Sequence, residues 1–388
     1  MGIAEARETI RACRHCFMCR YRNPGFIATK LESVTPHGHG ILLSEIDSGK
    51  RKWSAEIVDK IYQSPLGGEC RQDCAYHWPE DEMTRHARAE IINAQWAPPV
   101  VRGIAESILA HGTPFGARNG WAKAHGGSSA GKGAEVLFLS GDAAEHLQPG
   151  ILNAVSGLLD LFGVPWAAME NESPSGATLF DLGFVEEARR AASRLADEIS
   201  RRKPATIVTT CPHTLRALRE SFPQWGVELP RGIELLHTSE FFLRFLKEQA
   251  AGGFADPGVD RIAYHDCAEL GRKLGVFQPP REIVSRITGK APIEFHRCRE
   301  KSGSSGAGSS MFLTHPQLSV RIAQKTLEGI PEPGAELLVT GCPTCKTTFQ
   351  RALEATQSAT GVIDVSELLA GALMPQTRTR SSKGGKSQ

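Results

Sequence analysis

The chain has 388 residues, of which 40% are hydrophobic and 23% charged, and these fractions are ordinary for a folded globular protein. Its 45 Lys and Arg residues nearly balance its 43 Asp and Glu residues, for a net charge of +2. This balance gives no strong field for nucleic acid, and the composition excludes whole-chain disorder, collagen and coiled coils. No apolar run approaches the roughly 20 residues of a membrane span, and the first residues lack the apolar stretch of a signal peptide. We therefore expect a cytoplasmic protein, which can still be peripheral to a membrane through a partner.

Ten cysteines are present, and because disulfides are rare in cytoplasmic proteins, short cysteine spacings suggest metal or redox chemistry. Residues 1–100 contain five of them, together with helix-like patterns at 4–11, 53–62 and 83–96. We predict that this segment is a helical domain with metal ligands.

Three cysteines near the start follow one another at short, equal intervals. Cys13-x2-Cys16-x2-Cys19 is followed by Asn23 and Pro24. The bacterial two-cluster ferredoxin run is C-x2-C-x2-C-x3-C-P. The first run therefore keeps three cysteines and the proline, with Asn in the fourth ligand position.

A second run fits the same template less completely. Ser64, Gly67, Cys70 and Cys74 take the four ligand positions, and Ala75 stands in place of the proline. In two-cluster ferredoxins the fourth cysteine of each run binds the other cluster. This rule divides the remaining cysteines unequally between two sites.

One of the two sites is complete and the other is not. The complete site has the four ligands Cys13, Cys16, Cys19 and Cys74. The other would need Ser64, Gly67, Cys70 and Asn23, of which only Cys70 is a thiol. Because four thiolates can each bind one iron of a cubane, we predict one [4Fe–4S] cluster in a ferredoxin-like domain, with Cys70 a free thiol.

Other interpretations of this region stay open. Four thiolates also make a closed zinc site, although structural zinc sites usually consist of two C-x2-C pairs. His37 and His39 in the sequence TPHGHG resemble a metal pair, but we interpret them as exposed histidines of a turn. We interpret His15 as a packing or solvent-facing residue.

The composition changes after the first hundred residues. Residues 101–133 end in a Gly- and Ser-rich stretch, so we expect a linker. From 134 to 250, buried-strand patterns alternate with helical patterns, which favours parallel α/β layers. The strand patterns lie at 136–140 and 206–210, and the helical patterns at 152–162, 185–199 and 215–222.

The segment 251–375 repeats features of the preceding unit. TIVTTCPHT around Cys211 matches LLVTGCPTC around Cys342, and PSG at 174–176 matches SSG at 304–306. We therefore predict two homologous α/β units that pair around a pseudo-two-fold axis. The predicted fold class is α+β with α/β repeats: a helical cluster domain followed by two units. Residues 376–388 are polar and basic, and we expect a disordered tail.

The C-terminal unit reads YHDCAELGRKLGVFQPPREIVSRI, then RCREKSGSSGAGSSM, then LLVTGCPTCKTTFQ. This order resembles the cysteine-rich domain, often called the CCG domain, of heterodisulfide reductase and glycolate oxidase iron–sulfur subunits. That family places a ferredoxin-like two-cluster domain before two such repeats, and the resemblance covers residues 1–370. In some members the cysteines of the repeats hold unusual clusters that carry out disulfide chemistry.

Both repeats depart from the family pattern. The Cys-Cys-Gly of the family is Ser-Ser-Gly at 304–306 and Pro-Ser-Gly at 174–176. The first repeat keeps only Cys211 of its Cys-Pro-x-Cys motif, so it cannot hold a cluster. The second could assemble a site only if the fold brings together Cys267, Cys298, Cys342 and Cys345.

Three interpretations apply to the Cys342/Cys345 pair: reduced thiols without a role, which we favour, a redox-active dithiol or metal site, and a retained cluster. A C-x2-C pair alone does not decide among them. Cys267 also sits one position away from where the family pattern would place it.

The predicted function is electron transfer. The resemblance implies an iron–sulfur subunit that relays electrons through one cluster, with the flavin on a partner dehydrogenase and a quinone or flavoprotein as acceptor. We expect no catalytic residue in this chain and no nucleic-acid partner. Two other classes remain: an assembly module with a structural metal site, and a thiol–disulfide oxidoreductase that uses Cys342 and Cys345.

Overall fold

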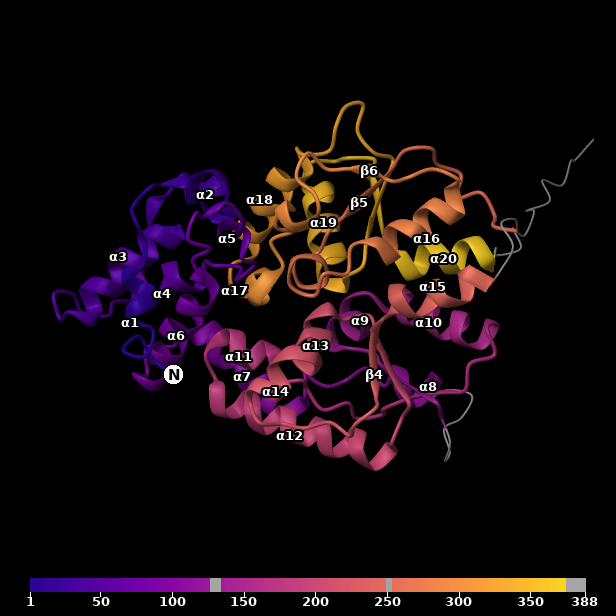
Figure 1. Ribbon diagram of the computed structural model, residues 1–388, viewed down its shortest axis with the longest axis horizontal. Helices are drawn as coiled ribbons and strands as arrows, with labels where there is room; N and C mark the ends of the chain where they lie inside the picture. The colour runs from indigo at the N-terminus through magenta and orange to yellow at the C-terminus, as the bar shows by residue number, and fades with distance from the viewer. Residues whose placement is uncertain (126–133, 249–252, 375–388) are drawn as a thin grey trace, which may run out of the picture.

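A computed structural model describes residues 1–125, 134–248 and 253–374. The N-terminal part is entirely helical and packs beside two α/β units (Figure 1). Its helices are α1 (Arg7–Arg11), η1 (Met18–Tyr21), α2 (Pro24–Thr29), η2 (Glu32–Val34), α3 (Pro36–Asp47), α4 (Ala55–Tyr62), α5 (Glu69–Asp73), α6 (Glu80–Asn93) and α7 (Pro99–His111).

Apolar residues at helical spacing hold these helices together. In α6, Met83, Ala87 and Ile91 lie on one face and pack into a core with Ile57 and Ile61 of α4. The same core includes residues of the first α/β unit. The helical part is therefore continuous with the rest of the molecule.

The first α/β unit is built on a parallel four-stranded sheet of order β2-β1-β3-β4. Strand β1 is buried along its whole length, as expected for a parallel strand covered on both faces. The strands are β1 (Val136–Leu139), β2 (Trp166–Ala168), β3 (Thr206–Thr209) and β4 (Glu234–His237). The helices are α9 (Asp142–Leu147), α10 (Pro149–Leu161), α11 (Ala177–Leu182), α12 (Val185–Arg202), α13 (Pro212–Arg216), the π-helix η3 (Ala217–Ser221), α14 (Phe222–Gln224) and α15 (Thr238–Glu248).

The second α/β unit has a parallel sheet of the same order, β6-β5-β7-β8. The strands are β5 (Ile262–His265), β6 (Ile293–Glu294), β7 (Leu337–Thr340) and β8 (Gly361–Asp364). The helices are the π-helix η4 (Ala268–Lys273), α16 (Gln278–Thr288), η5 (Arg299–Lys301), η6 (Gly308–Ser310), α17 (Met311–Thr314), α18 (Pro316–Leu327), α19 (Pro343–Ala355) and α20 (Val365–Leu373).

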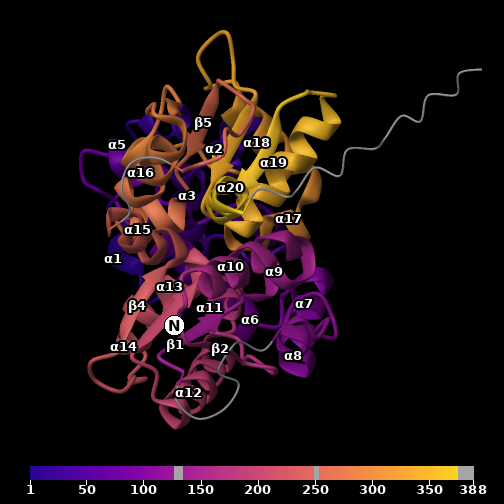
Figure 2. The same cartoon turned by 90° about the vertical axis from the view of Figure 1, so that its right-hand side faces the viewer.

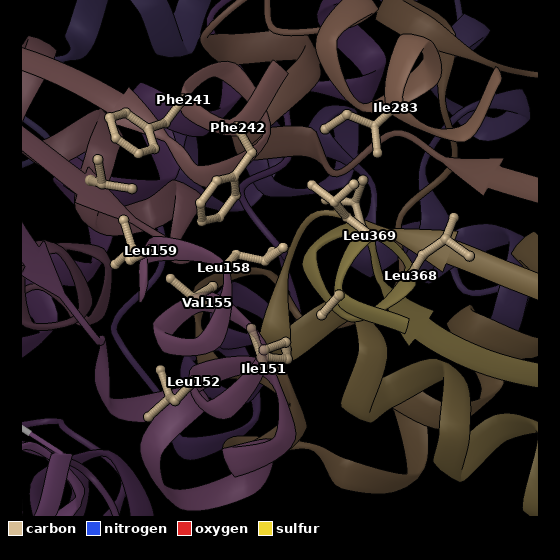
Figure 3. Packing of buried hydrophobic residues seen from close by; sticks show 14 of the residues in the cluster. Ile151, Leu152, Val155, Leu158, Leu159, Phe241, Phe242, Ile283, Leu368 and Leu369 are labelled. Atoms are coloured by element: carbon tan, nitrogen blue, oxygen red, sulfur yellow. The ribbon is translucent and has the colours of Figure 1, made fainter. Parts of the chain in front are cut away.

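The two units pack through corresponding helices. Helix α10 packs on α20, and α15 packs on α16. Figure 3 shows this shared core, where Leu158 and Phe242 of the first unit lie near Ile283 and Leu369 of the second. Because α10 corresponds to α16 and α15 to α20 in chain order, this reciprocal packing supports the expected pseudo-two-fold pairing, and the second view shows the two units in contact (Figure 2).

Part of the expected linker is helical instead. Helix α7 occupies 99–111, and α8 (Trp121–His125) follows it. Val101, Ile104 and Ile108 bury one face of α7 in the N-terminal core, so tertiary packing orders a segment whose composition looked loose. Residues 126–133 and the expected tail at 376–388 lie outside the described residues. Among the described residues, no helix has both the length and the apolarity to cross a membrane.

Candidate functional site

The four predicted cluster ligands gather at one end of the helical part. Cys13 and Cys16 lie in the loop after α1, Cys19 lies in η1, and Cys74 ends α5. Burial, followed by the nearby Cys16 and Cys74 thiols, raises the pKa of Cys13, although the His15 backbone opposes it. Burial, with Cys13 among the smaller causes, likewise raises the pKa of Cys19. Cys13 is thus close enough to all three other thiols to interact with them electrostatically.

The backbone of the ligand loop is tightly wound. His15 and Phe17, which alternate with the cysteines, have positive φ angles of 55° and 61°. This conformation is uncommon for residues other than glycine. Cys16 is exposed, whereas Cys13 and Cys19 are half-buried. The donor set, four thiols with one at the surface, fits a [4Fe–4S] cluster with one accessible edge.

Two histidines lie beside the Cys13 thiol. His37 Nδ1 lies 3.7 Å from Cys13 Sγ, and the His15 and His37 rings meet edge to face with centroids 4.9 Å apart. Ligand atoms of Cys13, His15 and His37 all lie within 4.8 Å of one another. The imidazoles can therefore contact a metal group bound at Cys13 and adjust its environment.

The interpretation of His37 and His39 as exposed residues of a turn is wrong. Both are buried in the first turns of α3, with 4% and 1% of their surface exposed. Thr35 caps this helix by accepting a hydrogen bond from Gly38 N at 2.9 Å. The sequence T-P-H-G was therefore a helix start, with proline at its first position.

The four positions of the incomplete ferredoxin site do come together. Asn23, Ser64, Gly67 and Cys70 line one small cavity with Glu69 and Glu80. Its volume is about 10 Å³, which is room for one water molecule at most. A Cβ atom on Gly67 would lie 2.3 Å from the Glu69 carboxylate. A carboxylate thus occupies the space that a ligand at position 67 would need.

Cys70 itself is a buried thiol in this cavity. Its Sγ lies 3.9 Å from the Cys19 carbonyl oxygen. Burial, followed by the nearby Glu80 carboxylate, raises the pKa of Cys70 well above its usual value. The Asn23 side chain accepts a hydrogen bond from Phe26 N at 2.7 Å and caps α2. Asn23, in the fourth ligand position, therefore stabilises the start of α2.

Two buried carboxylates, Glu172 and Asp142, line the site of the first α/β unit. Glu172 accepts hydrogen bonds from Ser140 N at 2.8 Å and from Gly141 N at 3.3 Å. Burial raises the pKa values of Glu172 and Asp142. Cys211 is the thiol beside them, facing Gly141. The acidic residues were not singled out from the sequence, although the segment Asn-Glu-Ser directly before Pro-Ser-Gly was visible there.

In the second unit three of the four expected cysteines meet. The Sγ atoms of Cys267, Cys342 and Cys345 all lie within 4.8 Å of one another, and all three residues are buried. Cys298 is not in this group; it is half-buried, and Glu294 and Asp266 are among the groups that affect its pKa. Ser305 lies beside the three cysteines and donates a hydrogen bond from its Oγ to Cys345 Sγ at 3.1 Å.

The edges of the two sheets share a cavity of about 80 Å³. Cys211 and Asp142 line it from the first unit, and Cys267, Cys342 and Cys345 from the second. The cavity is polar on the first unit's side and thiol-rich on the second unit's side. Carboxyl ends of parallel strands are the usual place for a ligand site in an α/β protein.

The fold and these thiol clusters define an α/β protein with side-chain groups that could hold a metal ion. Residues 262–350 match the family described as "Cysteine-rich domain", CCG. The expected resemblance to CCG-domain iron–sulfur oxidoreductase subunits is thus confirmed by this match and by the relatives.

Two of these relatives and one solved structure illustrate the likeness. One subunit of the dihydromethanophenazine:CoB–CoM heterodisulfide reductase of Methanosarcina barkeri is 29% identical over 62% of this chain and 59% of that protein. The probable iron–sulfur-binding oxidoreductase FadF of Bacillus subtilis is 29% identical over 63% of this chain and 35% of that protein. The match thus spans about three-fifths of the reductase protein and about a third of FadF. A crystal structure of a hypothetical protein from Helicobacter pylori covers 87% of this chain and is itself covered over 68%, with a TM-score of 0.56 and 10% identity, so it shares the fold alone.

Proposed function

We propose that this chain is an electron-transfer subunit of an oxidoreductase complex and relays single electrons through one [4Fe–4S] cluster. Cys13, Cys16, Cys19 and Cys74 hold the cluster. The observation that carries the proposal is the contrast between these four neighbouring thiols and the second ferredoxin position, which a carboxylate fills.

The exposed side of the cluster site supports exchange with a partner. Phe17, Met18, Tyr21 and Tyr76 are among the exposed large hydrophobic residues, and they belong to the two cysteine-bearing loops. Exposed apolar side chains gathered around one site are typical of a docking surface. The flavin belongs to a partner dehydrogenase, and a quinone or second flavoprotein accepts the electrons.

The relatives supply independent support. FadF is described as an iron–sulfur-binding oxidoreductase, and the Methanosarcina relative is one subunit of a reductase. The description of the Methanosarcina relative agrees with a chain that works within a larger assembly.

The test is iron and sulfide analysis of anaerobically purified protein, with EPR spectra before and after dithionite. We expect about four irons and one reduced [4Fe–4S] signal per chain. Cys74→Ser removes this signal, while Cys70→Ser, the matched control from the same short helical segment, keeps it. Loss of iron in Cys70→Ser, or a protein with zinc and no iron in the N-terminal site, contradicts the proposal.

A further inference from the structure

A cavity of about 570 Å³ lies where the N-terminal helices meet both α/β units. Helix α6 contributes Arg85 to its lining, α11 contributes Phe180, and α13 contributes Arg216. Figure 1 shows these three helices gathered at the junction, and α6 packs on α11. The volume is typical of a small-molecule site, and no cysteine is among the lining residues. The cavity is therefore separate from the thiol sites described above.

Positive charge dominates the lining of this cavity. Six Arg and Lys side chains line it, against three carboxylates. Of the three, Asp81 is paired with Arg85 and Lys273, and the other two are exposed. Two further carboxylates that balance the buried arginines, Asp181 and Glu269, are not among the lining residues. The surface that a ligand meets is thus cationic.

Two buried arginines of the lining have donors to spare. Arg85, 6% exposed, donates from Nε to Asp181 Oδ1 at 2.9 Å and from Nη1 to Asp81 Oδ2 at 3.1 Å. Its Nη2 is buried and has no hydrogen-bond partner among the described residues. Arg216, 8% exposed, is paired through Nε, 2.9 Å from Glu269 Oε2, which leaves its terminal nitrogens for a ligand. Because an unpaired buried donor costs free energy, these guanidinium groups favour an anion in the cavity.

The other cations of the lining have different uses. Arg272 Nη1 donates to Gly67 O at 2.9 Å, and Lys273 Nζ donates to Leu66 O at 2.9 Å. Both therefore hold the second α/β unit against the N-terminal part. The remaining two arginines of the lining are exposed, and they attract an anion toward the cavity.

An aromatic wall stands beside the buried arginines. The rings of Phe180 and Trp225 have their centroids 4.9 Å apart, and both residues are half-buried and line the cavity. The Arg85 guanidinium lies 5.9 Å from the Phe180 ring centroid, so the wall adjoins the cationic surface. A ligand that is anionic at one end and planar at the other matches both features.

We propose that this cavity binds a mononucleotide, a phosphate monoester that carries a planar ring. The phosphate binds Arg85 and Arg216, because a guanidinium group matches two phosphate oxygens with parallel hydrogen bonds. The ring lies against Trp225. Asp81 Oδ1, which is buried without a hydrogen-bond partner among the described residues, accepts from a hydroxyl or amino group of the ligand. Purine and flavin mononucleotides share this chemistry, and binding does not depend on the proposed electron transfer.

The experiment is isothermal titration calorimetry of the full chain under anaerobic conditions, with AMP, FMN, inorganic phosphate and adenosine as probes. We expect AMP or FMN to bind at least tenfold more tightly than phosphate and adenosine, because each of these two fills only one part of the cavity. The comparison of AMP with FMN identifies the ring that the aromatic wall accepts.

Two variants locate the ligand. Arg216→Lys keeps a charge beside Glu269 but removes the forked donors, so it should weaken binding of the nucleotide at least tenfold. Trp225→Leu should weaken binding of the nucleotide and leave that of inorganic phosphate unchanged. Arg190→Lys is the matched control, because Arg190 is exposed, pairs with Glu187 and is not among the lining residues.

Several results would overturn this proposal. They are the absence of binding by both AMP and FMN, or a tighter nucleotide that exceeds phosphate or adenosine by less than tenfold. Equal nucleotide binding by Arg216→Lys and Arg190→Lys would place the ligand elsewhere and would also overturn it. If Arg216→Lys fails to fold, Trp225→Leu decides by the same comparison with the control.

Discussion

A side chain at position 67 would overlap with the Glu69 carboxylate, near the N-terminal thiols. A Cβ on Gly67 would lie 2.3 Å from the Glu69 carboxylate, which is buried. We expect Gly67→Ala to destabilise the protein by about 1–3 kcal/mol. Urea unfolding measures this, and the penalty should shrink in a Glu69→Ala background, since the two residues touch. Gly103→Ala, in an open position of α7, is the control and should not destabilise; equal effects of the two alanines would refute the steric explanation.

Glu80 makes stability depend on pH. Burial, followed by the neighbouring Asp81 carboxylate, raises the pKa of Glu80 from 4.5 to about 8. The folded state therefore holds a proton that the unfolded state releases, so the contribution to stability is complete below pH 4.5 and declines as the pH rises through about 8.

Glu80→Gln should remove this dependence. Glutamine stays neutral, so the variant should match the wild type near pH 5 and exceed it above pH 8 by on the order of 1–3 kcal/mol. Urea midpoints measured across this range report the difference. Glu82→Gln is the control, because Glu82 is exposed on the same helix; a parallel pH profile for Glu80→Gln would contradict the assignment.

At the scale of elements, a glycine at the equivalent position of each α/β unit lets a loop approach a helix closely. Gly176 and Gly306 have φ angles of 80° and 78°. A Cβ on either would lie 2.3 Å from a helix carbonyl oxygen, that of Ala188 in α12 or Ser319 in α18. The backbone therefore requires glycine at both positions.

We therefore expect Gly306→Ala to cost about 2–4 kcal/mol, from the positive φ together with a clash against backbone that cannot move. Gly289→Ala tests the φ contribution alone, since Gly289 has φ 70° and open space around it, and it should cost about 1 kcal/mol. Guanidinium unfolding of both variants gives the comparison. Equal costs would mean that the close approach to α18 is unimportant.

The sequence predicts those strands that a local apolar pattern defines. Strands β1 and β3 were predicted from their short apolar runs, and β7 follows from the match between TIVTTCPHT and LLVTGCPTC. The two-residue β6 has no such signal, because it exists only through pairing with β5. The same limit applies to the sites. Cysteine spacing predicts which thiols can meet, but the placement of Glu69, Asp142 and Glu172 depends on partners distant in the chain.

At the scale of the whole molecule, hydrogen bonds join the N-terminal helices to both α/β units. Tyr62 Oη donates to Leu182 O at 2.8 Å in the first unit. Lys273 Nζ in the second unit donates to Leu66 O at 2.9 Å. These contacts start from the segment between α4 and α5, so they hold the cysteine-bearing N-terminal part against both α/β units.

Arg88 contacts all three parts. It is fully buried in α6 and donates to Ser64 O at 2.7 Å, to Asp181 O at 2.8 Å and to the Ser309 hydroxyl. Arg88→Met keeps the apolar stem and leaves these acceptors unpaired, which should cost about 3–5 kcal/mol. The loss should fall on the junction, so hydrogen exchange should rise first in α4 and α11 and later in the buried strands. Mass spectrometry of exchange measures this, with the exposed Arg190→Met as control. Uniform acceleration throughout the chain would mean that the three parts unfold as one unit and that Arg88 contributes only to global stability.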